Sequence, residues 1–74
     1  MIDKKNFCRI VGENIRKIRE EDKMISQEYL GELTEFDRTY IGSIERGEKN
    51  VSFYAIYKII VALDIDPTDF FNQI

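Results

Sequence analysis

The residues from Arg38 to Arg46 combine arginine, small polar side chains and a glycine at helical spacing. At about 100° per residue, Ile41 and Ile44 lie on one side of such a helix. The opposite side carries Thr39, Gly42, Ser43 and Arg46, with Arg38 at its edge. Short side chains allow close approach to a groove, and arginine offers a planar fork of donors. This face is typical of a helix that reads DNA; an ordinary solvated face is the alternative that periodicity leaves open.

Two short helices joined by a tight turn are expected between Ser26 and Arg46. Ser26 is a candidate N-cap of the first, because a side-chain oxygen there accepts from a free backbone N–H. Asp37 is the corresponding cap of the second, and Gly47 supplies a left-handed residue that ends it. The turn between them is expected at residues 34–36. The pattern is therefore helix, turn, helix.

Three further helices are expected around this pair. The first runs from about Lys5 to Asp22, with a single apolar stripe of Phe7, Val11, Ile15 and Ile18. The fourth, roughly Phe53 to Leu63, follows a Ser52 cap, and its core side is expected to carry Phe53, Ile56, Ile59, Ile60 and Leu63. The fifth runs from Pro67 to Asn72, since Asp66 and Pro67 form a strong start signal. Nothing alternates with period two, so the fold class is all-α: a compact five-helix domain spanning residues 1–74.

The fourth helix is too apolar for a monomer of this size. A second stripe off its core side, together with the last residues of the chain, predicts a two-fold dimer interface. The residues of that interface are Tyr54, Tyr57, Val61, Phe71 and Ile74. The alternative is that the fifth helix or the N-terminal segment covers the stripe.

The composition of the chain argues against several classes of function. The 74 residues are 43% hydrophobic and 34% charged, which is typical of one small globular domain. A single cysteine, Cys8, and no histidine make a zinc site or a catalytic site improbable, and no cofactor or small-molecule ligand is expected. No apolar run approaches the ~18 residues that span a bilayer, and no signal peptide opens the sequence. A cytoplasmic protein with no membrane partner is expected.

The net charge of −3 argues against binding nucleic acid through bulk charge. The charge is unevenly distributed, however. Residues 20–37 hold seven acidic residues and one basic residue, so the remainder of the chain has a net charge of +3. Any binding to DNA must therefore be local, and the acidic segment is expected to face away from phosphate.

Three segments carry a family resemblance: NIRKIREE, SQEYLGELTEFDRTYIGSIERGEKN and SFYAIYKIIVALDIDPTDFF. Together they resemble the lambda-repressor-like helix-turn-helix domain of the phage-repressor type, also called the XRE or Cro-repressor type. The resemblance runs from about Asn14 to Phe71. DRTYI followed by IERG and Asn50 resembles, more narrowly, the controller proteins of restriction–modification systems.

The resemblance implies roles for individual residues. Gln27 is expected to clamp the DNA backbone, and Tyr40 to lie at the flank of the reading face. Base-facing positions in the major groove are Arg38, Thr39 and Ser43, and phosphate contacts are Arg46, Lys49 and Asn50. For Lys49 and Asn50 a solvated loop is the alternative. Arg19 and Glu45 match a structural pair that joins the first helix to the third.

The chain also departs from the family pattern. Glu35 stands where the turn usually has a glycine, so it must adopt a left-handed conformation or shift the turn. Gly31 fills a position where the family needs a small residue for close helix approach. The function expected is a transcriptional regulator that binds a pseudo-palindromic operator as a homodimer, with double-stranded DNA as its partner and RNA polymerase as a further candidate. The alternatives are a protein-interaction module or an antitoxin-type regulator on the same fold.

Overall fold

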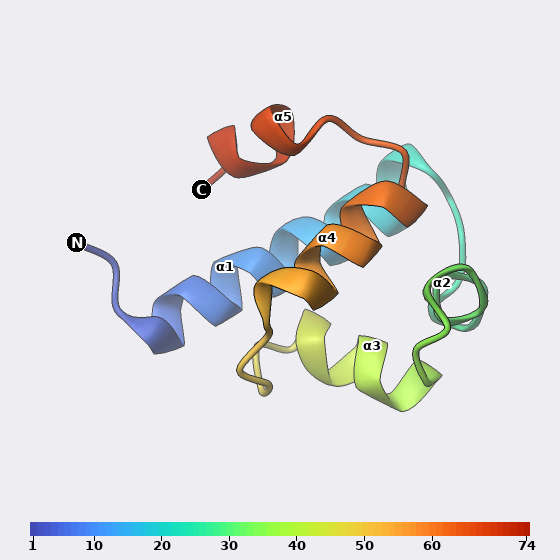
Figure 1. Ribbon diagram of the computed structural model, residues 1–74, viewed down its shortest axis with the longest axis horizontal. Helices are drawn as coiled ribbons and strands as arrows, with labels where there is room; N and C mark the ends of the chain where they lie inside the picture. Colours follow the sequence, from blue (N-terminus) through green and yellow to red (C-terminus); the bar gives the residue numbers. More distant parts are fainter.

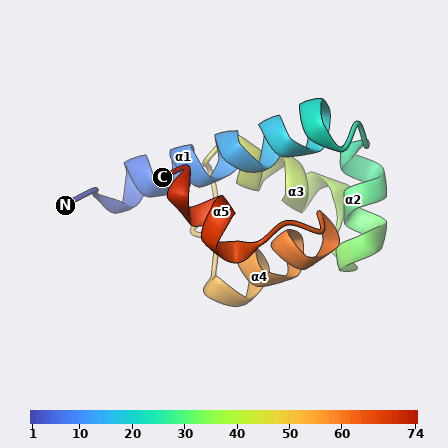
Figure 2. The same cartoon turned by 90° about the horizontal axis from the view of Figure 1, so that it is seen from above.

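The computed structural model describes residues 1–74 and contains five α-helices and no strand. They are α1 (Lys4–Lys17), α2 (Gln27–Thr34), α3 (Arg38–Glu45), α4 (Phe53–Ala62) and α5 (Pro67–Asn72). Helix α1 packs against α3, α2 packs against both α3 and α4, and α5 packs against α4; α3 and α5 lie on opposite sides of α4 (Figures 1 and 2). The all-α fold expected from the sequence is confirmed.

The first helix differs from the one predicted. The sequence predicted a continuous α-helix to Asp22, whereas α1 ends at Lys17 and continues as a π-helix, η1 (Ile18–Asp22). Its wider turn closes where the backbone N–H of Lys23 donates to the carbonyl of Ile18 at 2.9 Å. Short π segments inside helices frequently mark functional positions. Here the π turn carries Arg19.

The predicted helix starts are confirmed. Ser26 Oγ accepts from the N–H of Tyr29 at 2.9 Å, and Asp37 Oδ1 accepts from that of Thr39 at 2.7 Å. Ser52 and Asp66 cap α4 and α5 in the same way. Asp3 caps α1, a start that the sequence analysis did not predict. Each cap satisfies backbone donors that a helix leaves free in its first turn.

Several helix ends use left-handed residues. Gly47 adopts φ +75° after α3, as expected. Glu35 adopts φ +64° after α2, so the left-handed conformation, and not a shifted turn, replaces the usual glycine. Met24 and Asp64 also have positive φ. Non-glycine residues pay a steric cost in this region, so each of the three positions is strained.

The core lies between α1, α3 and α4, with Leu30 of α2 and Phe70 of α5 closing it. Its buried side chains are Val11, Ile15, Leu30, Ile41, Ile44, Ile56, Ile59, Ile60, Leu63 and Phe70. Phe53 was predicted to point into the core, which is wrong: it is the first residue of α4 and is 82% exposed, with its ring centroid 6.4 Å from that of Phe71. Leu33, three residues after the buried Leu30 on α2, is also exposed.

Two glycines let helices approach closely. A Cβ at Gly12 of α1 would clash with the carbonyl oxygen of Ile44 and lie 2.7 Å from that of Glu45. A Cβ at Gly31 of α2 would lie 2.7 Å from the carbonyl oxygen of Phe36. Real Cβ atoms do not approach this closely, so both positions require glycine. The small-residue requirement at Gly31 was anticipated; the one at Gly12 was not.

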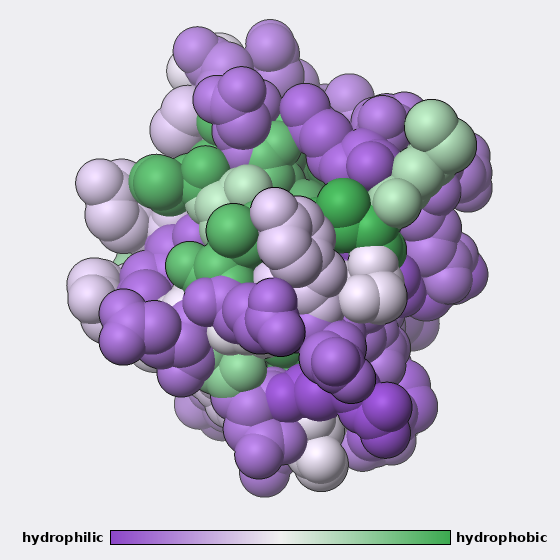
Figure 3. Space-filling view, turned by 90° about the vertical axis from the view of Figure 1, so that its right-hand side faces the viewer, coloured by the Kyte–Doolittle hydropathy of each residue, from purple (hydrophilic) through white to green (hydrophobic).

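Apolar side chains remain uncovered on two parts of the surface. On α4, Tyr54, Tyr57 and Val61 are 66%, 59% and 58% exposed, and we call these three residues the α4 stripe. Neither α5 nor the N-terminal segment covers the stripe, so that alternative is wrong. Figure 3 shows a second group of apolar side chains, ringed by polar ones, on the side formed by α2 and the loop before it; Met24, Tyr29 and Leu33 are exposed there. No helix is long and apolar enough to cross a membrane.

Candidate nucleic-acid interface

A buried ion pair fixes the orientation of α3. Arg19 Nε donates to Glu45 Oε2 at 2.6 Å and Arg19 Nη2 donates to Glu45 Oε1 at 3.0 Å. Both residues are almost fully buried, 6% and 5% exposed. The hydrogen bond that Arg19 donates to Glu45 raises the pKa of Arg19 above its ordinary value, against the opposing effect of burial. Two parallel hydrogen bonds give the pair a defined geometry, so the structure contains the link between the first and third helices that the resemblance implied.

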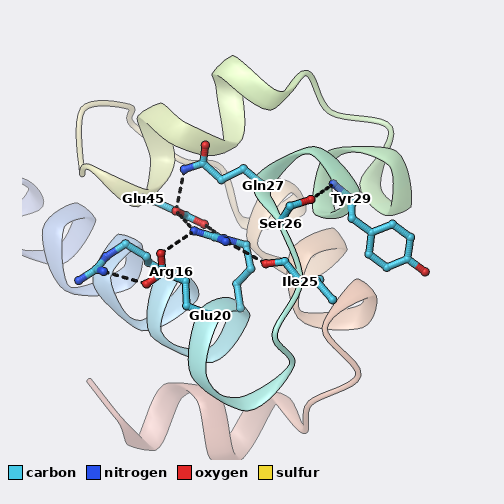
Figure 4. A network of polar contacts seen from close by, with 8 residues as sticks. Arg16, Glu20, Ile25, Ser26, Gln27, Tyr29 and Glu45 are labelled. Atoms are coloured by element: carbon cyan, nitrogen blue, oxygen red, sulfur yellow. Dashed lines mark hydrogen bonds and ion pairs between the residues drawn. The ribbon is translucent and has the colours of Figure 1, made fainter.

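The ion pair extends into a network that reaches α2. Arg19 Nη1 donates to the carbonyl of Ile25 at 2.9 Å, which ties the loop before α2 to the π turn. Gln27 Nε2 donates to Glu45 Oε1 at 3.0 Å. Figure 4 shows Gln27 and Glu45 pointing toward each other, with the carbonyl of Ile25 nearby. Three elements are therefore joined around one carboxylate.

This network holds the side chain of Gln27, the predicted backbone clamp. Its amide nitrogen donates to Glu45, whereas its Oε1 accepts no hydrogen bond within the chain. The backbone N–H groups of Gln27 and Glu28 open α2 and find no acceptor in the chain. Free N–H groups at a helix start are suited to a phosphate oxygen.

Beside Gln27 is an open hollow between α2 and α3 that is lined only by polar residues. We call it the α2–α3 hollow; its residues are Arg19, Glu20, Ser26, Gln27, Glu28 and Arg38. The hollow brings Gln27 together with Arg38, as the site prediction requires. It also contains Glu20 and Glu28, which runs against the expectation that the whole acidic segment faces away from this surface. Glu20 is paired with Arg16 at 3.0 Å and with Arg19 at 3.3 Å, whereas Glu28 forms no ion pair.

The outer side of α3 forms a second hollow. We call it the α3 hollow; its residues are Asp37, Thr39, Tyr40, Ser43, Arg46, Glu48 and Lys49. Thr39 is exposed on it, while Tyr40 is half-buried with its ring edge-on to that of Phe36, at a centroid distance of 5.0 Å. Five of the predicted DNA-contacting residues thus share one depression. Asn50 lies farther along, in an adjoining hollow that also contains Lys49.

Ser43 is less available than the sequence suggested. It is 5% exposed, and its hydroxyl donates to the carbonyl of Tyr40 at 2.9 Å. A base contact from Ser43 would require that hydroxyl to turn. The reason is that α3 packs against both α1 and α2, so its residues from Ile41 to Glu45 are buried and only Arg38, Thr39 and Arg46 at its ends are exposed.

Arg46, a predicted phosphate contact, is not free in this structure. Arg46 Nε and Nη2 donate to the two carboxylate oxygens of Glu48, at 2.8 Å and 3.2 Å. This pairing lowers the pKa of Glu48 and raises that of Arg46. Both side chains are exposed. Sequence reasoning missed Glu48, although an acidic residue two positions from an arginine at the end of a helix was a visible signal.

Gly42 lies on the same side as Arg46 and Gln27. A Cβ there would lie 3.2 Å from Arg46 Nη1 and 3.6 Å from both amide atoms of Gln27. The two side chains therefore cover the backbone of α3 at Gly42, which is buried beneath them.

Comparison with known proteins identifies the family of the chain. A family model described as Helix-turn-helix matches residues 15–70. The control protein C.BamHI of Bacillus amyloliquefaciens is 42% identical over 64 residues, covering 86% of this chain and 79% of that protein. The control protein C.MunI of a Mycoplasma species is 38% identical over 63 residues, covering 85% of each chain.

Solved structures give the same result. The restriction–modification controller protein C.AhdI from Aeromonas hydrophila superposes with a TM-score of 0.81 at 40% identity, covering 88% of this chain and 97% of that one. The controller protein C.Esp1396I, solved as a tetramer in complex with its natural 35 base-pair operator, superposes with a TM-score of 0.83 at 33% identity, covering 89% and 86%. The family comprises DNA-binding regulators and not enzymes, which confirms the expectation from the sequence that the protein is not an enzyme. The chain belongs to the helix-turn-helix family and, within it, to the controller proteins of restriction–modification systems.

Proposed function

We propose that this protein is a sequence-specific transcriptional regulator that binds a pseudo-palindromic operator as a homodimer. The observation that carries the proposal is the contrast between the two sides of α3. Its inner side is locked to α1 and α2 by the buried Arg19–Glu45 pair and by Gln27, while Arg38, Thr39 and Arg46 remain exposed on the outer side. A rigidly held helix with donors on its free side is suited to the major groove.

Arg38 is the proposed base-reading residue. It is exposed at the first position of α3 and forms no ion pair within the chain, so its guanidinium is free to donate two parallel hydrogen bonds to guanine. Thr39 lies next to it. Lys49, Asn50 and the start of α2 would then lie along the phosphates on either side of the groove, where they position the protein without reading sequence.

The homodimer is supported by the α4 stripe. Three large side chains are more than half exposed on one helix, and the exposed Phe53 and half-buried Phe71 extend the apolar surface at one end. A two-fold axis through this surface would place two copies of α3 in successive major grooves, ~34 Å apart. Phe71 and Ile74 remain predicted members of the interface.

Regulation would follow from protein concentration. Dimerisation and cooperative occupancy of the operator make the response depend steeply on the amount of protein. A relative, C.Esp1396I, binds its own operator as a tetramer, which supports autoregulation combined with control of a restriction gene. The protein would act on DNA in the cytoplasm, and RNA polymerase is the further partner to be tested in a reconstituted transcription reaction.

Selection of bound duplexes from a random-sequence pool tests the proposal. The expected result is an enriched motif with two related half-sites. Arg38→Ala should relax the preference at one position in each half-site by about 1–3 kcal/mol, whereas Lys49→Ala should weaken binding to all sequences evenly. No enrichment at low salt would contradict the proposal.

A protein-interaction module is the rival function. Glu28, unpaired in the α2–α3 hollow, is the observation that favours it, because a carboxylate repels phosphate. Salt dependence separates the two: a DNA-binding protein loses affinity with a log–log slope near −0.9 per phosphate contacted. An antitoxin-type regulator would be indicated by a toxin gene beside this one, in place of a methyltransferase and an endonuclease.

A further inference from the structure

The N-terminal half of α1 lies beside the loop that follows α3. A Cβ at Gly47 in that loop would be 2.9 Å from the Cα of Arg9. Lys4 and Lys5, one turn earlier on α1, line a shallow hollow together with Lys49 and Asn50. Figures 1 and 2 both show the start of α1 next to this loop.

This N-terminal hollow is continuous with the α3 hollow. Glu48 and Lys49 line both of them. One surface therefore extends from Thr39, across Lys49, to Lys4 and Lys5. In Figure 1 the first turn of α1, the loop and α3 share the lower side of the molecule.

The far end of this surface is rich in basic side chains. Lys4, Lys5 and Lys49 are all exposed, and none of the ion pairs in the chain includes them. Of the carboxylates nearby, Glu48 is paired with Arg46, and Asp3 accepts from the N–H of Asn6 at 2.8 Å as the cap of α1. Three free ammonium groups on one edge are suited to a row of phosphates.

We propose that Lys4 and Lys5 bind the DNA phosphate backbone beyond the segment covered by α3. The inference rests on the proposed function and extends it, because it adds α1 to the DNA-contacting surface. Continuity with the reading face favours DNA over an acidic protein as the occupant. These contacts carry no sequence information; they increase affinity and fix the position of the protein on the duplex.

The test compares two double variants with equal charge change. Lys4→Ala with Lys5→Ala removes the proposed contacts; Lys17→Ala with Lys23→Ala removes two exposed lysines that line other hollows. Binding is titrated over a range of salt concentrations, using a duplex of random sequence and the duplex recovered by selection. Thermal unfolding checks that every variant is folded.

The expected result is specific to the first pair. Lys4→Ala with Lys5→Ala should reduce the salt slope by about 0.9 per lysine and lower the affinity for both duplexes by about tenfold per lysine at low salt. Lys4→Arg with Lys5→Arg should restore both. The control pair should resemble the unchanged protein.

Equal salt slopes for both pairs would overturn the inference, as would a loss confined to the selected duplex. If an acidic protein uses this edge instead, DNA binding will not change, which also overturns it. If the proposed function itself is wrong, the unchanged protein will enrich no motif in the selection, and this result is distinct from the outcomes of the lysine variants.

Discussion

Arg46 and Glu48 form an exposed, bidentate ion pair at the edge of the α3 hollow. A phosphate contact by Arg46 must displace the carboxylate of Glu48 or tolerate it nearby. Glu48 therefore competes with DNA for the same guanidinium. Charge-assisted hydrogen bonds of this kind are exchanged most easily where both partners are solvated.

Glu48→Gln should accordingly strengthen binding to DNA of any sequence. It frees Arg46 and removes one negative charge from the surface, so the salt slope should become steeper by about 0.9. Fluorescence anisotropy against a random-sequence duplex measures both effects. Glu32→Gln, an equal charge change at an exposed residue of α2, is the control and should bind like the unchanged protein.

Variants of the Arg19–Glu45 pair can show separately how the pair affects the stability of the fold and how it affects the orientation of α3. Glu45→Ala leaves Arg19 buried without a counter-charge and should lower the free energy of unfolding by about 3–5 kcal/mol. The double variant Arg19→Met with Glu45→Leu should recover most of that stability, because an apolar pair fills the same space. Even so, the double variant should bind DNA more weakly than the unchanged protein, since α3 loses its link to Gln27 and Ile25.

Urea unfolding and DNA titration of both variants check this. If the double variant binds DNA as tightly as the unchanged protein, the pair does not orient α3. At the residue scale the family resemblance implied the Arg19–Glu45 pair, whereas the Arg46–Glu48 pair was not predicted. The burial of Ser43 and the capture of Arg46 by Glu48 depend on neighbours brought in by other helices.

Helix packing depends on where α1 crosses α3. Gly12→Ala should destabilise the protein by about 3 kcal/mol or more, because the new methyl meets the backbone carbonyls of Ile44 and Glu45, which cannot move without shifting α3. Gly42→Ala is the matched control. Its methyl would meet only the movable side chains of Arg46 and Gln27, so stability should stay the same or rise by up to about 1 kcal/mol. Urea unfolding midpoints distinguish the two.

The N-cap of α3 makes stability depend on pH. The hydrogen bond from the N–H of Thr39 holds the pKa of Asp37 below its ordinary value. A lowered folded-state pKa stabilises the fold above the unfolded value, about 3.9, and this contribution disappears as the pH falls through the folded value. Melting temperatures of the unchanged protein and of Asp37→Asn, which retains a capping oxygen without the charge, should therefore converge below about pH 4. A constant difference between pH 7 and pH 3 would contradict this.

At the element scale the sequence was informative where the signal is local. Ser26, Asp37, Ser52 and Asp66 were predicted as caps because capping involves residues two or three apart. The π turn at Ile18–Asp22 was not predicted, since Ile18 continues the apolar stripe of the helix before it. Phe53 was assigned to the core because it continues the apolar stripe of Ile56 and Ile60, and the stripe does not indicate that the first residue of α4 lies beyond the core.

At the scale of the whole molecule, the α4 stripe is exposed in the single chain, and we propose that a second copy covers it in a dimer. Val61→Glu should convert a dimer of the 8.8 kDa chain into a monomer and sharply reduce occupancy of the selected duplex. Binding of each monomer to random-sequence DNA should change little, because the α3 hollow is not altered. Analytical ultracentrifugation and a DNA titration measure the two effects.

Met24→Glu is the control for this prediction. Met24 is also an exposed apolar residue, but it lies on the side formed by α2 and its preceding loop. It should leave the dimer intact. Dissociation by Met24→Glu but not by Val61→Glu would move the interface to that other surface.

The left-handed residue Glu35 has a consequence for the time scale of regulation. Its strained backbone lies outside the hollows assigned to DNA, so it lowers stability without changing recognition. A difference of 1–2 kcal/mol in stability alters the abundance of a protein in the cell severalfold, because unfolded copies are degraded. For a regulator that acts through its own concentration, this turn helps to set the lifetime of each copy, and therefore how soon the signal fades once synthesis stops.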